Sequence, residues 1–212
     1  MSEKYLLLIT ILEFVTAVLA TVLFKKYTDS REKYFLYFLW FTVFVEIGGA
    51  LMRYVFSVEN FWLYNFYMVI SFLFYFYWYY LILKQKNVQR TVLVFSVVFT
   101  GVALWNLVFQ SWAEYHQYTF VVGALFTLIV TVFHFWQLLY SNQILVIQYK
   151  LSFWISSGLL LFYIGMVPLM LLSRYFKLTG SSYYILIISL NGILYGCYII
   201  GFLWTKEKYN RF

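Results

Sequence analysis

Long, uninterrupted apolar stretches constrain this chain more than any other feature of its sequence. An apolar helix needs about 20 residues to cross the hydrocarbon core of a bilayer. Seven stretches reach that length, at residues 5–24, 34–56, 61–83, 91–110, 118–140, 149–173 and 182–204. The runs are continuous and do not alternate, which indicates helices and not the strands of a membrane barrel. The sequence therefore predicts an all-α integral membrane protein, with residues 1–212 forming a single seven-helix transmembrane domain.

Composition and charge placement support this prediction and add an orientation. Only 11% of the 212 residues are charged, against roughly a quarter in soluble domains. With seven spans, 11 of the 15 Lys and Arg residues fall on one side, and Lys4, Arg53, Arg174 and Lys177 fall on the other. Loops rich in Lys and Arg stay in the cytoplasm, so we expect the N-terminus outside, the C-terminus inside and the protein in the plasma membrane.

Two further segments allow separate predictions. The first apolar stretch is followed by no cleavage-site pattern of small residues, so we expect it to be retained as a helix. The segment 141–148, SNQILVIQ, is half apolar and is a candidate for lying along the membrane interface.

Two acidic residues, Glu13 and Glu46, lie inside the apolar stretches. A helix rises about 1.5 Å per residue, which places both acids and Asn191 roughly 12 to 15 Å below the outer ends of their helices, near one plane. Ionisable groups are costly in lipid, so both acids should face the bundle interior and be either neutral or paired. Two carboxyl groups at one depth can also share a proton.

Further polar side chains are expected above this plane, nearer the outer surface. We therefore predict an outward-facing polar cavity in which ligand is bound by Glu13, Glu46, Arg53, Asn65, His116, Arg174, Asn191 and Tyr195. The alternative is that these groups satisfy one another as interhelical hydrogen bonds. The aromatic residues Trp62, Tyr64 and Tyr67 either line the same cavity or belong to an interfacial belt and to helix packing.

Small residues and a proline predict how the helices pack. Gly192 and Gly196 form a G-x-x-x-G pattern, and Gly48 and Gly49 follow Glu46, so close helix approach is expected at both places. Pro168 is expected to kink the stretch 149–173 or to free a carbonyl group one turn earlier.

The sequence offers no convincing catalytic, metal or cofactor site. His116 and His134 are 18 residues apart on one expected helix, roughly 27 Å along its axis, and cannot share a metal ion. A mixed metal site of Glu13, Glu46 and His116, or a serine–histidine pair of Ser156 or Ser157 with His134, are the weaker alternatives. Cys197 is the only cysteine, which excludes an internal disulfide.

Topology gives the leading functional hypothesis. Seven helices with the N-terminus outside are similar in arrangement to rhodopsins and G-protein-coupled receptors, although residues 182–204 contain no lysine for a retinal Schiff base. We expect a receptor-like sensing module that binds a small molecule and signals to a separate cytoplasmic or membrane protein partner. The alternatives are a small proton-coupled transporter or a structural subunit of a larger membrane complex. Membrane orientation accounts for the net charge of +7, so lipid is an expected partner and nucleic acid is not.

Overall fold

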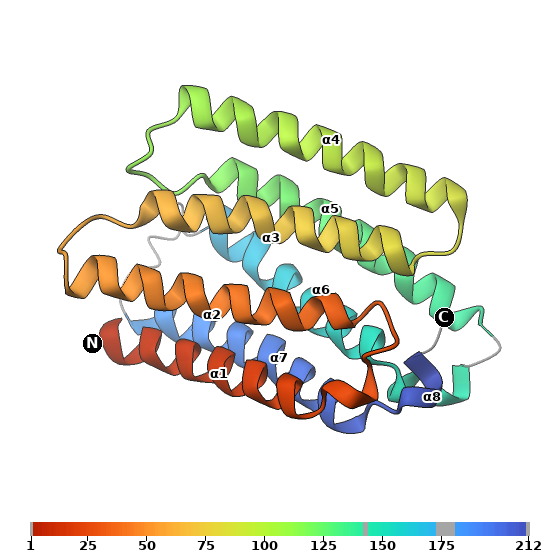
Figure 1. The fold of residues 1–212 in the computed structure, drawn as a ribbon. Coiled ribbons are helices and arrows are strands. Elements are labelled where there is room, and N and C mark those ends of the chain that lie inside the picture. The colour runs from red at the N-terminus through yellow and green to blue at the C-terminus, as the bar shows by residue number, and fades with distance from the viewer. Residues whose placement is uncertain (1, 142–143, 173–180, 211–212) are drawn as a thin grey trace.

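The computed structural model describes residues 2–141, 144–172 and 181–210, and these residues form helices joined by short connections. The seven long helices are α1 (Ser2–Val22), α2 (Lys33–Tyr54), α3 (Phe61–Ile82), α4 (Lys86–Phe109), α5 (Gln117–Leu139), α6 (Leu151–Leu172) and α7 (Ser181–Trp204) (Figure 1). Three short helices complete the described chain: η1 (Phe24–Lys26), η2 (Ile144–Tyr149) and α8 (Glu207–Asn210). No strand occurs among the described residues.

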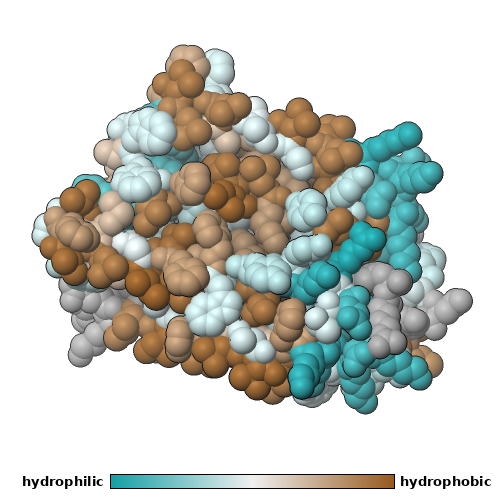
Figure 2. Space-filling model, in the orientation of Figure 1, coloured by the Kyte–Doolittle hydropathy of each residue, from teal (hydrophilic) through white to brown (hydrophobic). Residues whose placement is uncertain are grey.

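Six of the helices, α2 to α7, are long and apolar enough to cross a membrane. Helix α1 is apolar as well over Leu7–Val22. Apolar side chains cover much of the surface toward the viewer in Figure 2. Exposed large side chains include Val97, Val108 and Tyr118. A soluble monomer rarely exposes so much contiguous apolar surface. The protein is therefore an integral, multi-pass membrane protein.

The main helix contacts close six helices into a ring. Helix α1 packs on α2, α2 on α3, α3 on α5, α5 on α6, α6 on α7, and α7 returns to α1. Helix α4 instead packs against α3 and α5 from outside the ring, and it lies at the edge of the bundle in Figure 1. Its buried side chains are accordingly few: Val92, Phe99, Ala103 and Asn106. The interior of the ring thus belongs to the other six helices.

The two ends of the bundle differ in charge. The long helices alternate in direction, so the N- and C-termini lie at opposite ends (Figure 1). We call the end with the N-terminus and the 55–60 and 110–116 loops the cavity end, and the opposite end, which carries η1, η2 and α8, the basic end. Hydrophilic side chains gather at the basic end (Figure 2). The Lys and Arg residues described there are Lys25, Lys26, Arg31, Lys33, Lys84, Lys86, Arg90, Lys150, Lys206 and Lys208.

Helix boundaries differ from the predicted ones mainly where polar residues continue a helix. Helix α4 begins at Lys86 and not near residue 91, because Lys, Gln and Arg favour helix even outside the apolar stretch. The half-apolar connection forms the 3-10 helix η2, in which Leu145 is 90% exposed. A position of η2 along the membrane interface stays a prediction from the sequence.

A layer of aromatic side chains fills the ring toward the basic end. The Phe35 ring centroid lies 5.0 Å from that of Tyr198 and 5.9 Å from that of Trp78, and Trp78 lies 4.9 Å from Tyr79. All four side chains are buried. This aromatic layer separates the interior at the cavity end from the loops at the basic end.

Close helix approach occurs at Gly158, which the sequence did not single out, and at Gly49, one of the predicted glycines. A Cβ atom on Gly158 of α6 would lie 3.1 Å from the carbonyl oxygen of Leu194, so the backbones of α6 and α7 meet there. Among the described residues, nothing lies within 4 Å of the equivalent point on Gly192 or Gly196, so the predicted approach at this pair is wrong. Gly49 does meet a neighbour, the Tyr64 side chain. Helix α6 continues through Pro168 to Leu172.

Candidate functional site

A cavity of about 1240 Å³ occupies the ring at the cavity end. Its walls come from all six ring helices and from the 57–60 loop, and no residue of α4 contributes. Small-molecule sites usually have volumes of roughly 300–1,000 Å³, so this cavity is large enough for a small organic ligand. Both predicted acids, Glu13 and Glu46, lie in its wall.

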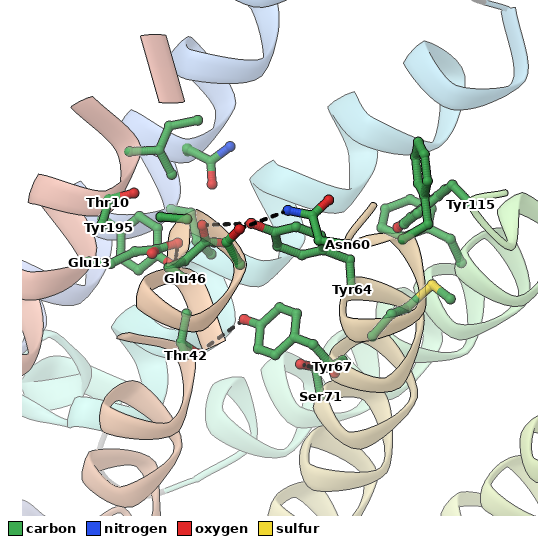
Figure 3. A pocket seen from close by; sticks show the side chains of 18 of the residues that line it. Thr10, Glu13, Thr42, Glu46, Asn60, Tyr64, Tyr67, Ser71, Tyr115 and Tyr195 are labelled. Atoms are coloured by element: carbon green, nitrogen blue, oxygen red, sulfur yellow. Dashed lines mark hydrogen bonds between the residues drawn. The ribbon is translucent and has the colours of Figure 1, made fainter. Parts of the chain in front are cut away.

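Glu13 is the more deeply buried of the two acids. Its side chain projects from α1 into the cavity and is only 5% exposed. The Tyr195 hydroxyl of α7 donates a hydrogen bond to Glu13 Oε1 at 2.9 Å (Figure 3). The second carboxyl oxygen, Oε2, is buried and has no hydrogen-bond partner among the described residues. A buried oxygen of this kind normally has a partner, so Oε2 is free to receive a donor from the cavity.

Glu46 enters the cavity from the neighbouring helix α2. The Tyr64 hydroxyl of α3 donates to Glu46 Oε2 at 3.1 Å (Figure 3). Gly49, one turn further along α2, makes room for this phenol, because a Cβ atom there would lie 2.7 Å from Tyr64 Oη. The two carboxyl groups are close enough to interact electrostatically. The acids therefore form one site and not two separate ones.

A second pair of hydroxyl groups lies one turn deeper. Thr42 Oγ1 and Tyr67 Oη are 3.0 Å apart and share a hydrogen bond (Figure 3). Ser71 Oγ donates to the Tyr67 carbonyl oxygen at 2.7 Å, and both residues line the cavity. These groups extend the polar wall below Glu46.

Neither acid is neutralised by a basic side chain among the described residues. Each carboxyl group is hydrogen-bonded to a phenol, and no described Lys or Arg forms an ion pair with it. Arg53 lines the mouth of the cavity, but it is exposed and lies over the Tyr54 ring, with its guanidinium carbon 5.9 Å from the ring centroid. The described cavity wall is consequently acidic around Glu13 and Glu46.

The deepest part of the cavity is aromatic. The Phe72 ring lies 5.9 Å from that of Phe120 and 5.5 Å from that of Tyr163, and all three side chains are buried. Tyr75 completes the floor, and Tyr198 of the aromatic layer lines its base. Gly123 of α5 allows α3 to approach, since a Cβ atom there would lie 2.5 Å from the Phe72 ring. The cavity thus has an acidic upper region and an apolar, ring-lined floor.

The structure brings together five of the eight predicted site residues. Glu13, Glu46, Arg53, Asn191 and Tyr195 line the cavity, and so do Tyr64 and Tyr67 from the aromatic third stretch. Trp62 is exposed and lies outside the lining set. Arg174 lies outside the described residues.

Asn65 and His116 have a different place from the predicted one. Neither is among the residues that line the cavity. Asn65 Nδ2 donates to the Glu114 carbonyl oxygen at 2.8 Å, and Asn65 Oδ1 accepts from the backbone N–H of His116 at 3.0 Å. The Asn65 side chain therefore fastens the 110–116 loop to α3, and this loop places Tyr115 in the cavity wall.

Sequence reasoning missed Thr42, Ser71 and the ring-lined floor. Helical spacing contained a signal for some of them, because Thr42 and Glu46 are four residues apart, and Tyr64, Tyr67, Ser71 and Tyr75 recur every three or four residues on α3. Once one member faces the cavity, the others face it too. Phe120 and Tyr163 come from other helices, and nothing in the sequence links them to this face.

The described residues show no arrangement that supports the mixed metal site or the serine–histidine pair. No group of three or more His, Cys, Asp or Glu side chains comes together there as a metal site. His134 lies against the aromatic layer, 5.9 Å from the Tyr79 ring, and neither of its nitrogens has a hydrogen-bond partner. The Ser156 hydroxyl instead accepts a hydrogen bond from Tyr79 at 3.0 Å.

A further acidic group, Glu32, is buried at the basic end, far along the bundle from the cavity. It precedes α2 and is 1% exposed. Burial raises the pKa of its carboxyl group to about 7, although Ser30, Lys150 and Ser152 counteract this effect. Burial also lowers the pKa of Lys150.

Comparison with protein-family models, with characterised proteins and with solved structures found no match for this chain.

Proposed function

We propose that this protein is a receptor-like membrane module that binds a small organic molecule in the cavity and passes a helix displacement to a partner protein at the basic end. The observation that carries the proposal is the cavity itself, which holds two acidic side chains and whose lining includes Tyr198 of the aromatic layer but none of Phe35, Trp78 and Tyr79. A site open to one side and blocked toward the other suits detection of a ligand without its passage.

We further propose that α1 is a seventh transmembrane helix and that the cavity end faces outward. Helix α1 supports this because it packs on α2 and α7 as a full member of the ring and runs beside them in Figure 1. The concentration of Lys and Arg at the other end favours a cytoplasmic position for that end. The plasma membrane is then the expected location, with the cavity accessible from the cell exterior.

Occlusion of the cavity tests the proposal. Ala50 lines the cavity near its mouth, so Ala50→Trp should fill part of the space. Val97 is 72% exposed on α4, outside the ring, so Val97→Trp is a matched control. We expect small amphiphiles that raise the thermal unfolding temperature of the purified protein in nanodiscs to lose this effect in Ala50→Trp and to keep it in Val97→Trp. Equal shifts in both variants would contradict binding in the cavity.

A small proton-coupled carrier is the second candidate, and polar groups near the basic end favour it. Glu32 Oε2, both nitrogens of His134 and the Trp78 indole N–H are buried there without hydrogen-bond partners among the described residues. Of these groups, Glu32 and His134 can accept and release protons, so together with the acids of the cavity they could take part in proton movement through the ring. Reconstituted vesicles separate the two functions, because a carrier moves its ligand or protons across the membrane and a receptor does not.

A further inference from the structure

The hydrogen-bonding pattern around Glu13 and Glu46 restricts the chemistry of the ligand. Ionised carboxylates accept hydrogen bonds and donate none. The hydroxyl groups of Tyr195 and Tyr64 already donate to these carboxylates, so their oxygens can only accept from a ligand. With both acids ionised, this part of the wall therefore offers acceptors alone, and a ligand that binds there must bring the donors.

The charge of the wall points in the same direction. Glu13 and Glu46 interact with each other and have no basic partner among the described residues, and Arg53 is exposed at the mouth. When the two acids share one proton, one negative charge stays in the cavity. A lone carboxylate in a low-dielectric space is strongly disfavoured, so it either takes up a proton or is accompanied by a positive group.

The buried oxygen of Glu13 gives an independent sign of a missing partner. Oε2 is buried in a side chain that is 5% exposed and lines the cavity, yet no described group donates to it. The phenol rings of Tyr64, Tyr67 and Tyr195 surround this region, and such rings attract cations electrostatically. An ammonium group combines a positive charge with N–H donors and meets all of these requirements.

The floor of the cavity determines the rest of the ligand. Phe72 is eight residues beyond Tyr64 on α3, about 12 Å along the helix. Its ring and those of Phe120 and Tyr163 offer an apolar surface for a hydrocarbon or aromatic group. We propose that the ligand is an amphiphilic organic amine, with its ammonium group between Glu13 and Glu46 and its apolar body on these rings. This inference rests on the proposed function and adds the class of ligand.

Three compounds that share a skeleton and differ in charge test the inference. The probes are 4-phenylbutylamine, 4-phenylbutanol and 4-phenylbutyrate, and the measurement is the thermal unfolding temperature of the full chain in nanodiscs as each is titrated. We expect the amine to raise this temperature in a saturable way, and the alcohol and the acid to have little effect. Glu13→Gln and Glu46→Gln should each weaken the response to the amine by at least about tenfold.

Each outcome bears on a separate claim. If the alcohol binds as well as the amine and Ala50→Trp removes both responses, the cavity binds ligands but the charge requirement is overturned. If the amine causes no shift, or if its shift survives both Gln substitutions, the inference also fails. Glu46 is only half-buried, so Glu46→Gln keeps the test usable if Glu13→Gln does not fold. Glu114→Gln, at an exposed position in the 110–116 loop, controls for loss of negative charge alone.

Discussion

At the scale of single residues, the best-defined interactions join a phenol to a carboxyl group across two helices. Tyr195 gives Glu13 the one hydrogen bond that this buried side chain has among the described residues. Tyr195→Phe should therefore lower the free energy of unfolding by roughly 1–3 kcal/mol, because the carboxyl group is left without a donor. Thermal or denaturant unfolding in detergent measures the effect.

Tyr118→Phe is the matched control for that substitution, since Tyr118 is 69% exposed at the start of α5. Equal stability of the two variants would show that the Tyr195 hydroxyl contributes nothing beyond its ring.

Glu32 makes a second prediction at this scale, concerning pH. Its pKa is about 7 in the folded protein and near the ordinary value of 4.5 when the chain is unfolded. Between pH 4.5 and 7 the carboxyl group is ionised in the unfolded chain but still protonated in the folded protein. The contribution of Glu32 to the free energy of unfolding is therefore greatest below about pH 4.5 and decreases as the pH rises to about 7. The difference is on the order of 3 kcal/mol. Glu32→Gln should flatten this part of the stability–pH profile and raise stability at neutral pH.

Unfolding temperatures measured from pH 5 to 8 test this expectation, with Glu114→Gln as the exposed control. A profile for Glu32→Gln that is parallel to that of the unmodified protein would rule out Glu32 as the source of the pH dependence.

At the scale of the helices, the ring depends on a few places where one element approaches another closely. Gly123 of α5 meets the buried Phe72 ring of α3, and a Cβ atom there would overlap it. Gly123→Ala should therefore destabilise the fold by roughly 1–3 kcal/mol and also disturb the cavity floor. The measurements are the unfolding temperature and the response to 4-phenylbutylamine.

Gly101 of α4 provides the comparison, because no atom of the described residues lies within 4 Å of a Cβ atom placed there. Gly101→Ala should leave stability unchanged or increase it by up to about 1 kcal/mol through better helix propensity. A greater loss in Gly101→Ala than in Gly123→Ala would contradict the placement of α4 outside the ring.

At the scale of the whole molecule, the contrast between the ends predicts how the protein sits in the membrane. Val58 is 50% exposed at the cavity end, and Lys86 is exposed at the basic end. In a Cys197→Ser background, Val58→Cys should react with a membrane-impermeant maleimide on intact cells, and Lys86→Cys only after permeabilisation. An N-terminal epitope tag should be accessible on the same side as position 58 if α1 spans the membrane.

The reverse labelling pattern would invert the proposed orientation and place the cavity toward the cytoplasm. A tag accessible only on the side of Lys86 would show that α1 does not cross the bilayer, while the other six helices would keep their topology.

The sequence by itself determined that the chain lies in a membrane and where its helices run, because about 20 apolar residues in a row have no other stable environment. It also predicted that Glu13 and Glu46 face a shared interior, since lipid disfavours carboxyl groups. The depth of a residue along its helix can be counted from the sequence. The rotation of that helix and the identity of its neighbouring helices cannot. For that reason Asn65 and His116 were assigned to the cavity although they hold a loop in place, and Gly192 and Gly196 were expected to make contacts that Gly158 makes instead.

Only the tertiary structure decided which helices close the ring, that α4 lies outside it, and that Phe72, Phe120 and Tyr163 form the floor beneath the acids. These features depend on contacts between residues far apart in the chain. Side-chain shapes select such contacts when the helices pack. The apolar residues of each helix are distributed almost uniformly around its circumference, so the sequence does not show which face of a helix meets which neighbour.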